Sequence, residues 1–90
     1  MRHATDQALD QLEDLLTEIR KYGHLKENKR GIFYFKSMAF LHFHEDPAGL
    51  FADLRVDGDF QRFCVNSITE QKILVSKVKD AITRFKESHR

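Results

Sequence analysis

The sequence contains one cysteine, one proline and no tryptophan in 90 residues. A single cysteine, Cys64, excludes both a disulfide within the chain and a zinc site built on several thiolates. No apolar run approaches the roughly 18 residues that a membrane-spanning helix needs. The first residues carry no apolar segment behind their basic side chain, so we expect no secretory signal. These absences predict a cytoplasmic protein without a membrane partner.

An excess of charge of one sign is also missing, because 15 basic residues face 14 acidic ones and the formal net charge is +1. The segment 32–66 carries three basic and five acidic residues, whereas 67–90 carries six basic and three acidic residues. A dedicated nucleic-acid-binding domain usually shows a clear basic excess, and an acidic central region repels phosphate. We therefore expect no nucleic-acid partner.

The apolar pattern predicts one helix near each end of the chain. Across residues 5–22, apolar side chains recur every three or four positions, as on the buried face of a helix. Thr5 or Asp6 suits the N-cap of this helix, and Gly23 suits a left-handed residue at its C-terminus. The second predicted helix covers residues 67–87 and has the same spacing of apolar side chains.

Between the helices, the pattern becomes that of strands. The four short strand-like segments are 32–35, 38–44, 50–56 and 60–65. Asp57-Gly58 predicts a two-residue type I′ hairpin, and Pro47 followed by Gly49 suits a type I turn. The polar segment 24–30 is expected to be a loop. The predicted fold is a single α+β domain, residues 1–90, in the order α-β-β-β-β-α: a four-stranded antiparallel meander with both helices on one face.

The other face of this sheet is left uncovered, and the two turns determine which side chains it carries. They place His42 opposite Asp53, and Asp53 opposite Arg62, so that Asp53 could accept hydrogen bonds from both neighbours. The candidate interface and binding residues on this face are Phe40, His42, His44, Phe51, Asp53, Arg55, Phe60 and Arg62.

A second row on the uncovered face places Arg55 between Phe40 and Phe60, an arrangement that suits cation–π contacts. This face is too aromatic to lie in plain solvent and too charged to be a core. We expect it to pack against a second copy in a homodimer, since two-fold dimers are the commonest oligomers. A surface for a peptide or small-molecule ligand and a catalytic site are the alternatives.

The sequence does not determine which side chains of the first strand, residues 32–35, lie on the uncovered face. A two-residue turn at Lys36-Ser37 puts Phe33 and Phe35 on the uncovered face. A three-residue turn puts Tyr34 there instead.

Metal binding and catalysis would use the same residues of the uncovered face. His42 and His44 give two imidazole ligands, but a closed zinc site uses four ligands and Asp53 is engaged by Arg62. We therefore expect no metal and no cofactor. His42 beside Asp53 suits an oriented general base, but Cys64, the nearest nucleophile, lies one row away. The predicted function is a self-associating binding or assembly module; a small enzyme or ligand-binding protein using His42, Asp53 and Arg62 is the alternative.

The segment Phe40-Leu41-His42-Phe43-His44-Glu45-Asp46, with residues 49–55 after it, resembles a hairpin of small uncharacterised bacterial α+β proteins. The resemblance covers about a third of the chain. It implies no activity and no catalytic residue.

Overall fold

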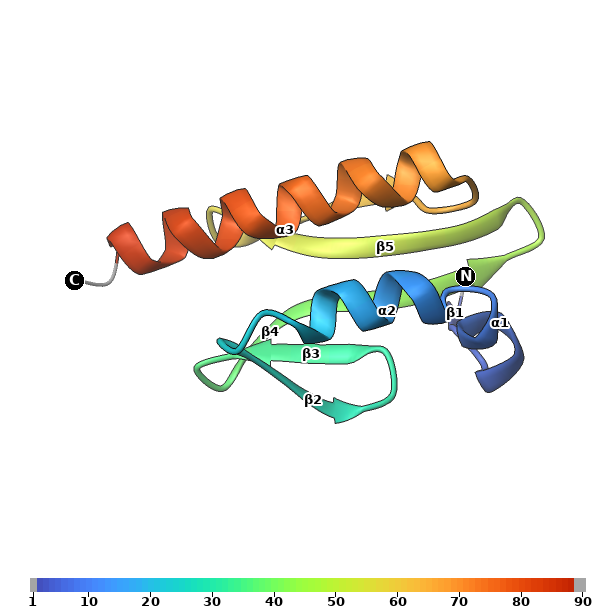
Figure 1. The fold of residues 1–90 in the computed structure, drawn as a ribbon, viewed down its shortest axis with the longest axis horizontal. Coiled ribbons are helices and arrows are strands. Elements are labelled where there is room, and N and C mark those ends of the chain that lie inside the picture. The colour runs from blue at the N-terminus through green and yellow to red at the C-terminus, as the bar shows by residue number, and fades with distance from the viewer. Residues whose placement is uncertain (1, 89–90) are drawn as a thin grey trace.

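The computed structural model describes residues 2–88 and confirms a fold of helices with one antiparallel sheet (Figure 1). The elements are β1 Arg2–His3, α1 Asp6–Asp10, α2 Glu13–Arg20, β2 Leu25–Lys29, β3 Ile32–Phe35, β4 Met38–Asp46, β5 Gly49–Val56, β6 Asp59–Cys64 and α3 Ile68–Ser88. The predicted order of two helices around four strands was therefore too simple. The first predicted helix is two helices, and two additional strands, β1 and β2, join the sheet.

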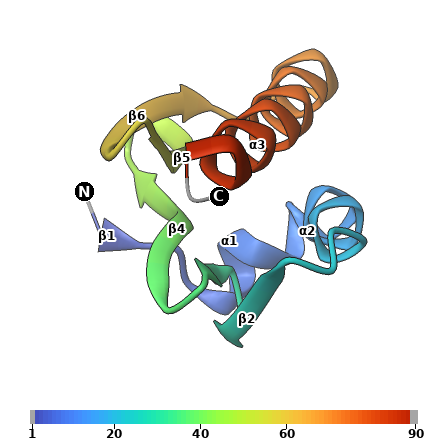
Figure 2. The same cartoon turned by 90° about the vertical axis from the view of Figure 1, so that its left-hand side faces the viewer.

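Neighbouring strands follow the order β2-β3-β4-β5-β6. The short strand β1 pairs with the far end of β4, placing Arg2 opposite Glu45 and His3 opposite His44. Figure 2 shows the sheet curving around α2 and α3, which lie side by side on its concave side. None of the helices described between residues 2 and 88 combines the length and the apolar character needed to cross a bilayer.

The core lies between the helices and the concave side of the sheet. Its buried side chains are Leu9, Leu12, Leu15, Leu16, Ile19, Phe33, Phe35, Phe40, Leu41, Phe43, Ala52, Leu54, Val65, Leu74, Val78, Ala81 and Ile82. Burying a Leu, Ile or Phe side chain of this kind contributes about 1.5–3 kcal/mol. The periodic apolar side chains of both predicted helices are therefore the ones that hold the helices to the sheet.

The predicted helix 5–22 is interrupted at Leu12. The Thr5 side chain accepts a hydrogen bond from the Ala8 N–H and caps α1 as predicted. Leu12 then leaves helical geometry, with φ −106° and ψ 11°, and α2 begins at the next residue. Because Leu12 is itself buried, the apolar spacing continues across the break, which is why that spacing did not reveal it. Gly23 has no positive φ, so the predicted left-handed C-terminus was wrong.

The predicted loop 24–30 contains β2 instead. This strand pairs with β3 through Leu25 opposite Phe35 and Lys26 opposite Tyr34. It lies at one edge of the sheet, and three of its five residues are exposed. Edge strands are commonly protected from aggregation by charged side chains, and such a strand has the composition of a loop.

A β-bulge in β4 corrects the predicted position of Phe40. The register of β3 on β4 shifts so that Tyr34 lies opposite Ala39 but Phe33 lies opposite Leu41. Phe40 is the extra residue between these pairs, and such a residue breaks the alternation of side chains. Phe40 is consequently 1% exposed and lies in the core, rather than on the uncovered face.

The same bulge decides the facing of β3. Lys36 and Ser37 form the turn, both with positive φ. A two-residue turn was expected to put Phe33 and Phe35 on the uncovered face, but both are 1% exposed in the core. Tyr34 takes the other side of the strand and is half-buried.

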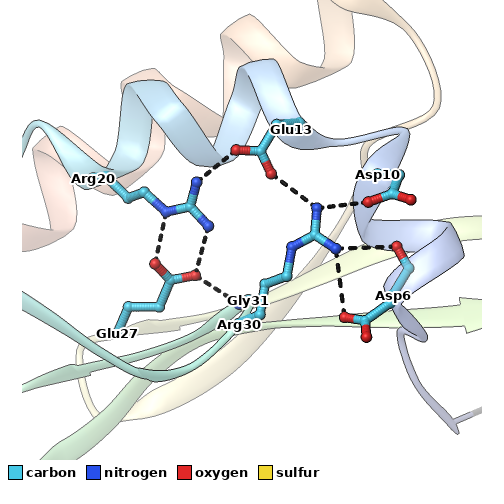
Figure 3. Close-up of polar contacts among 7 residues, drawn as sticks. All are labelled: Asp6, Asp10, Glu13, Arg20, Glu27, Arg30 and Gly31. Carbon is cyan, nitrogen blue, oxygen red and sulfur yellow. Dashed lines mark hydrogen bonds and ion pairs between the residues drawn. The ribbon is translucent and has the colours of Figure 1, made fainter.

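A network of ion pairs ties α1 and α2 to the β2–β3 hairpin (Figure 3). Arg20 donates from Nε to Glu27 at 2.6 Å and from Nη1 to Glu13 at 2.7 Å. Arg30 donates from Nη2 to the other oxygen of Glu13 at 2.9 Å. Asp6 and Asp10 also pair with Arg30. Glu27 accepts in addition from the Gly31 N–H at 2.8 Å, so one carboxylate holds both the helix and the hairpin turn.

Replacing Glu27 with glutamine is expected to lower stability at neutral pH by about 1 kcal/mol. Burial of the carboxyl opposes its ionisation, but the hydrogen bonds from Arg20 and Gly31 outweigh burial and leave the pKa of Glu27 lower than usual. The ion pair therefore stabilises the fold fully above the unfolded pKa, about 4.3, and this contribution disappears as the pH falls through the folded pKa.

Urea unfolding of both proteins between about pH 7 and pH 3 measures this difference, which should vanish at the acidic end. Glu18→Gln is the matched control, because Glu18 pairs with Lys21 and both side chains are more than half exposed. It should change stability by less than about 0.5 kcal/mol. A Glu27 variant with the same pH profile as the original protein would contradict the assignment.

Candidate functional site

The convex side of the sheet, away from α2 and α3, carries the candidate residues; we call it the outer face. Both predicted hairpin registers are confirmed. His42 lies opposite Asp53, and Asp53 lies opposite Arg62. In the next row His44 lies opposite Phe51, which lies opposite Cys64. These local registers follow from the turns at Asp46–Gly49 and Asp57-Gly58, and the latter has positive φ at both residues as a type I′ turn requires.

Asp53 is the buried charge of the outer face, with 8% of its surface exposed. Arg62 holds it in a bidentate pair, donating from Nε to Oδ1 at 2.8 Å and from Nη2 to Oδ2 at 2.9 Å. This hydrogen bonding is the main reason that the pKa of Asp53 is lowered; burial opposes it and the Arg62 charge adds to it. Asp53 is therefore a carboxylate at neutral pH.

The sequence predicted that His42 would contact Asp53, but the imidazole that does so is that of His44. His44 Nε2 lies 3.1 Å from Asp53 Oδ2. His42 Nδ1 lies 2.9 Å from the same Nε2 atom of His44. Partial burial is the largest cause that lowers the pKa of His42, followed by the neighbouring His44. His42 is consequently neutral at pH 7 and presents a lone pair.

A third imidazole, that of His3, joins this pair and was missed in the sequence analysis. Its ring centroid lies 4.9 Å from that of His44 and 5.7 Å from that of His42. Hydrogen bonds from Ala4 N–H to the Phe43 carbonyl and from Thr5 N–H to Glu45 extend the β1–β4 pairing. A two-residue strand has no periodicity to recognise, so no sequence signal linked His3 to β4.

Arg55 and Phe60 form the aromatic row of the outer face without Phe40. The Arg55 guanidinium carbon lies 4.5 Å from the centroid of the Phe60 ring. Arg55 also donates to the carbonyl of Ala39 at 2.7 Å and to that of Gly58 at 2.8 Å. Phe60 is 41% exposed and its ring meets the His42 ring edge-on at 4.8 Å. With Phe40 in the core, the outer face is less apolar than the sequence predicted.

The strand β6 is an edge strand of the sheet (Figure 2). Five of its six residues are exposed. The hydrogen bond from Val65 N–H to the Leu50 carbonyl shows that Val65 and Leu50 form a hydrogen-bonded pair of the β5–β6 ladder. Because bonded and non-bonded pairs alternate along an antiparallel ladder, the odd-numbered residues of β6 direct their backbone groups at β5. Phe60, Arg62 and Cys64 direct theirs outward, where no strand of residues 2–88 pairs with them.

No protein-family model, no curated protein and no solved structure matches this chain.

Proposed function

We propose that the protein is a self-associating binding module that forms a homodimer by pairing β6 with the β6 strand of a second copy. The observation that supports this most directly is the backbone of Phe60, Arg62 and Cys64, which faces outward from an exposed edge strand. An open edge of this kind pairs readily with another strand. We place the module in the cytoplasm, where the exposed Cys64 stays reduced.

The side chains of β6 select one register for such a dimer. A two-fold axis at Gln61 places Phe60 of each copy opposite Arg62 of the other, with both residues in hydrogen-bonded pairs. Each Phe60 ring then lies between its own Arg55 and the second copy's Arg62, extending the cation–π contact already present. An axis at Arg62 would instead oppose two like charges, which is unfavourable.

The expected dimer differs from the one predicted from sequence, which used a broad aromatic face. Phe40 is buried in the core and Phe51 is half-buried, so Phe60 is the large apolar side chain that the outer face exposes among the residues described. A contact between two six-residue strands is small by the standards of stable complexes. We therefore place the association at micromolar concentration.

Cysteine cross-linking tests the register. In a Cys64→Ser background, Gln61→Cys should form a disulfide-linked dimer on mild oxidation. The two Gln61 residues form a non-bonded pair with Cα atoms about 4.5 Å apart, within the range of disulfides. Asp59→Cys in the same background is the matched control, since Asp59 is equally exposed but lies opposite Phe63 in this register. No cross-linking at Gln61, or equal cross-linking at Asp59, would overturn the proposal.

Phe60→Lys tests the association itself. Sedimentation should show the original protein at twice its chain mass of 10.6 kDa at micromolar concentration. The variant should remain at 10.6 kDa, because lysine opposes the second copy's Arg62. Ile73→Lys provides the control, because Ile73 is a similarly exposed apolar residue that belongs to α3 and not to β6. If the original protein sediments as a monomer, or both variants behave alike, pairing through β6 is wrong.

A further inference from the structure

We infer that His3, His42 and His44 form a binding site for a late first-row divalent metal ion, with zinc as the ion to test. The described residues contain this one group of three or more ligand side chains whose donor atoms all lie close together. Imidazole nitrogen is a preferred ligand for zinc, copper and nickel. The expectation of no metal rested on finding only two histidines on one strand, and β1 supplies the third.

The spacing of the donor atoms suits one ion. One nitrogen of each ring lies within 4.8 Å of the others, and His42 Nδ1 is already 2.9 Å from His44 Nε2. In a tetrahedral zinc site with Zn–N bonds of about 2.0–2.1 Å, ligand nitrogens are about 3.3 Å apart. The separations in the structure differ from this value by at most about 1.5 Å, a difference that we expect side-chain rotation to close.

The polar contacts of His44 identify Nε2 as the nitrogen that would bind the ion. Its Nδ1 atom is buried and makes no hydrogen bond within the part of the chain described. Its Nε2 atom is approached by both His42 Nδ1 and Asp53 Oδ2. The Nε2 position carries at most one hydrogen, so it cannot donate fully to both neighbours at once. A cation placed between the imidazoles would accept their lone pairs and attract the Asp53 carboxylate.

The surroundings of the three imidazoles support a site with three protein ligands. Arg62 already binds both oxygens of Asp53, so this carboxylate is held beside the imidazoles and offsets part of the metal charge. His3 is exposed, which leaves the fourth position of a tetrahedral ion to water. Three protein ligands and one water is the arrangement of open zinc sites. Phe60, edge-on to His42, limits the motion of that ring.

Zinc titration of the full chain, free of any affinity tag and stripped of metal with a chelator, tests the inference. Calorimetry should give one zinc per chain. His3→Ala, His42→Ala and His44→Ala should each weaken binding more than about tenfold, because losing even an outer-shell partner costs that much. His24→Gln is the control, since His24 stacks on Phe35 and is not one of the three. Its affinity should equal that of the original protein.

The His3→Ala variant decides between this site and simpler binding by two histidines. His3 is exposed and its replacement leaves the core intact, which a thermal melt without metal would verify. With Co²⁺ in place of zinc, the original protein should show the visible absorption of a tetrahedral ion, and His3→Ala should lose it. Zinc binding that is absent, unaffected by His3→Ala, or equally weakened by His24→Gln would overturn the inference.

Discussion

Replacing Phe40 with alanine is expected to destabilise the protein by about 3–5 kcal/mol, the range found when a buried phenylalanine is cut to alanine. Phe40 is 1% exposed and its ring packs 5.7 Å from that of Phe35, which in turn packs against Phe85. Cutting this ring to alanine loses its burial and leaves a cavity in the core. Because small domains have total stabilities of only about 5–15 kcal/mol, the loss would be visible as a large drop in the urea midpoint.

Phe60→Ala is the matched control for this change. The pattern of alternating residues predicted the same face for both side chains, but Phe60 is 41% exposed. Its truncation should cost less than about 1 kcal/mol, mainly through the lost contact with Arg55. Unfolding should be measured at low protein concentration, so that dimer dissociation does not contribute. Equal losses for the two variants would show that the bulge is wrongly placed.

The second large effect is expected from Asp53→Ala, at about 1–3 kcal/mol. This substitution removes the acceptor of both Arg62 hydrogen bonds and the carboxylate beside His44. The loss is kept within this range because the Arg62 side chain is 51% exposed and water can replace its partner. The free energy of unfolding in urea, with zinc excluded by a chelator, measures it.

Arg84→Ala serves as the comparison, because the Arg84–Asp57 pair is also bidentate but both side chains are more than half exposed. It should change stability much less than Asp53→Ala does, because exposed ion pairs contribute little. If Asp53→Ala were as mild as Arg84→Ala, the row His42–Asp53–Arg62 would be a solvated surface feature.

The sequence predicted most reliably those parts of the site that depend on local geometry. Asp57-Gly58 and the turn at Asp46–Gly49 fixed the pairing of three strands, so the opposition of Asp53 to both His42 and Arg62 was predicted and is confirmed. A two-residue turn leaves little freedom in register. Each pair on these hairpins is determined within a few residues of its turn.

The errors arose where the fold departs from alternation or depends on distant pairing. A bulge such as that at Phe40 adds one residue without changing the apolar composition of the strand, so the pattern does not reveal it. The charged edge strand β2 resembles a loop in composition. The contact between His3 and His44 joins segments about 40 residues apart, and only packing in three dimensions brings them together.

The pairing of β1 with β4 also has a consequence for the order of folding. The strands β2 to β6 are joined consecutively, so each forms a hairpin with its neighbour in the chain and closes only a short loop. The two-residue strand β1 must close a loop of about 40 residues to reach β4 and gains few contacts in return. We therefore expect it to dock after the meander has formed and to be released first when the protein opens locally. On this expectation the strand that opens first also completes the three-histidine cluster, so an ion held there would fix Arg2–His3 to β4.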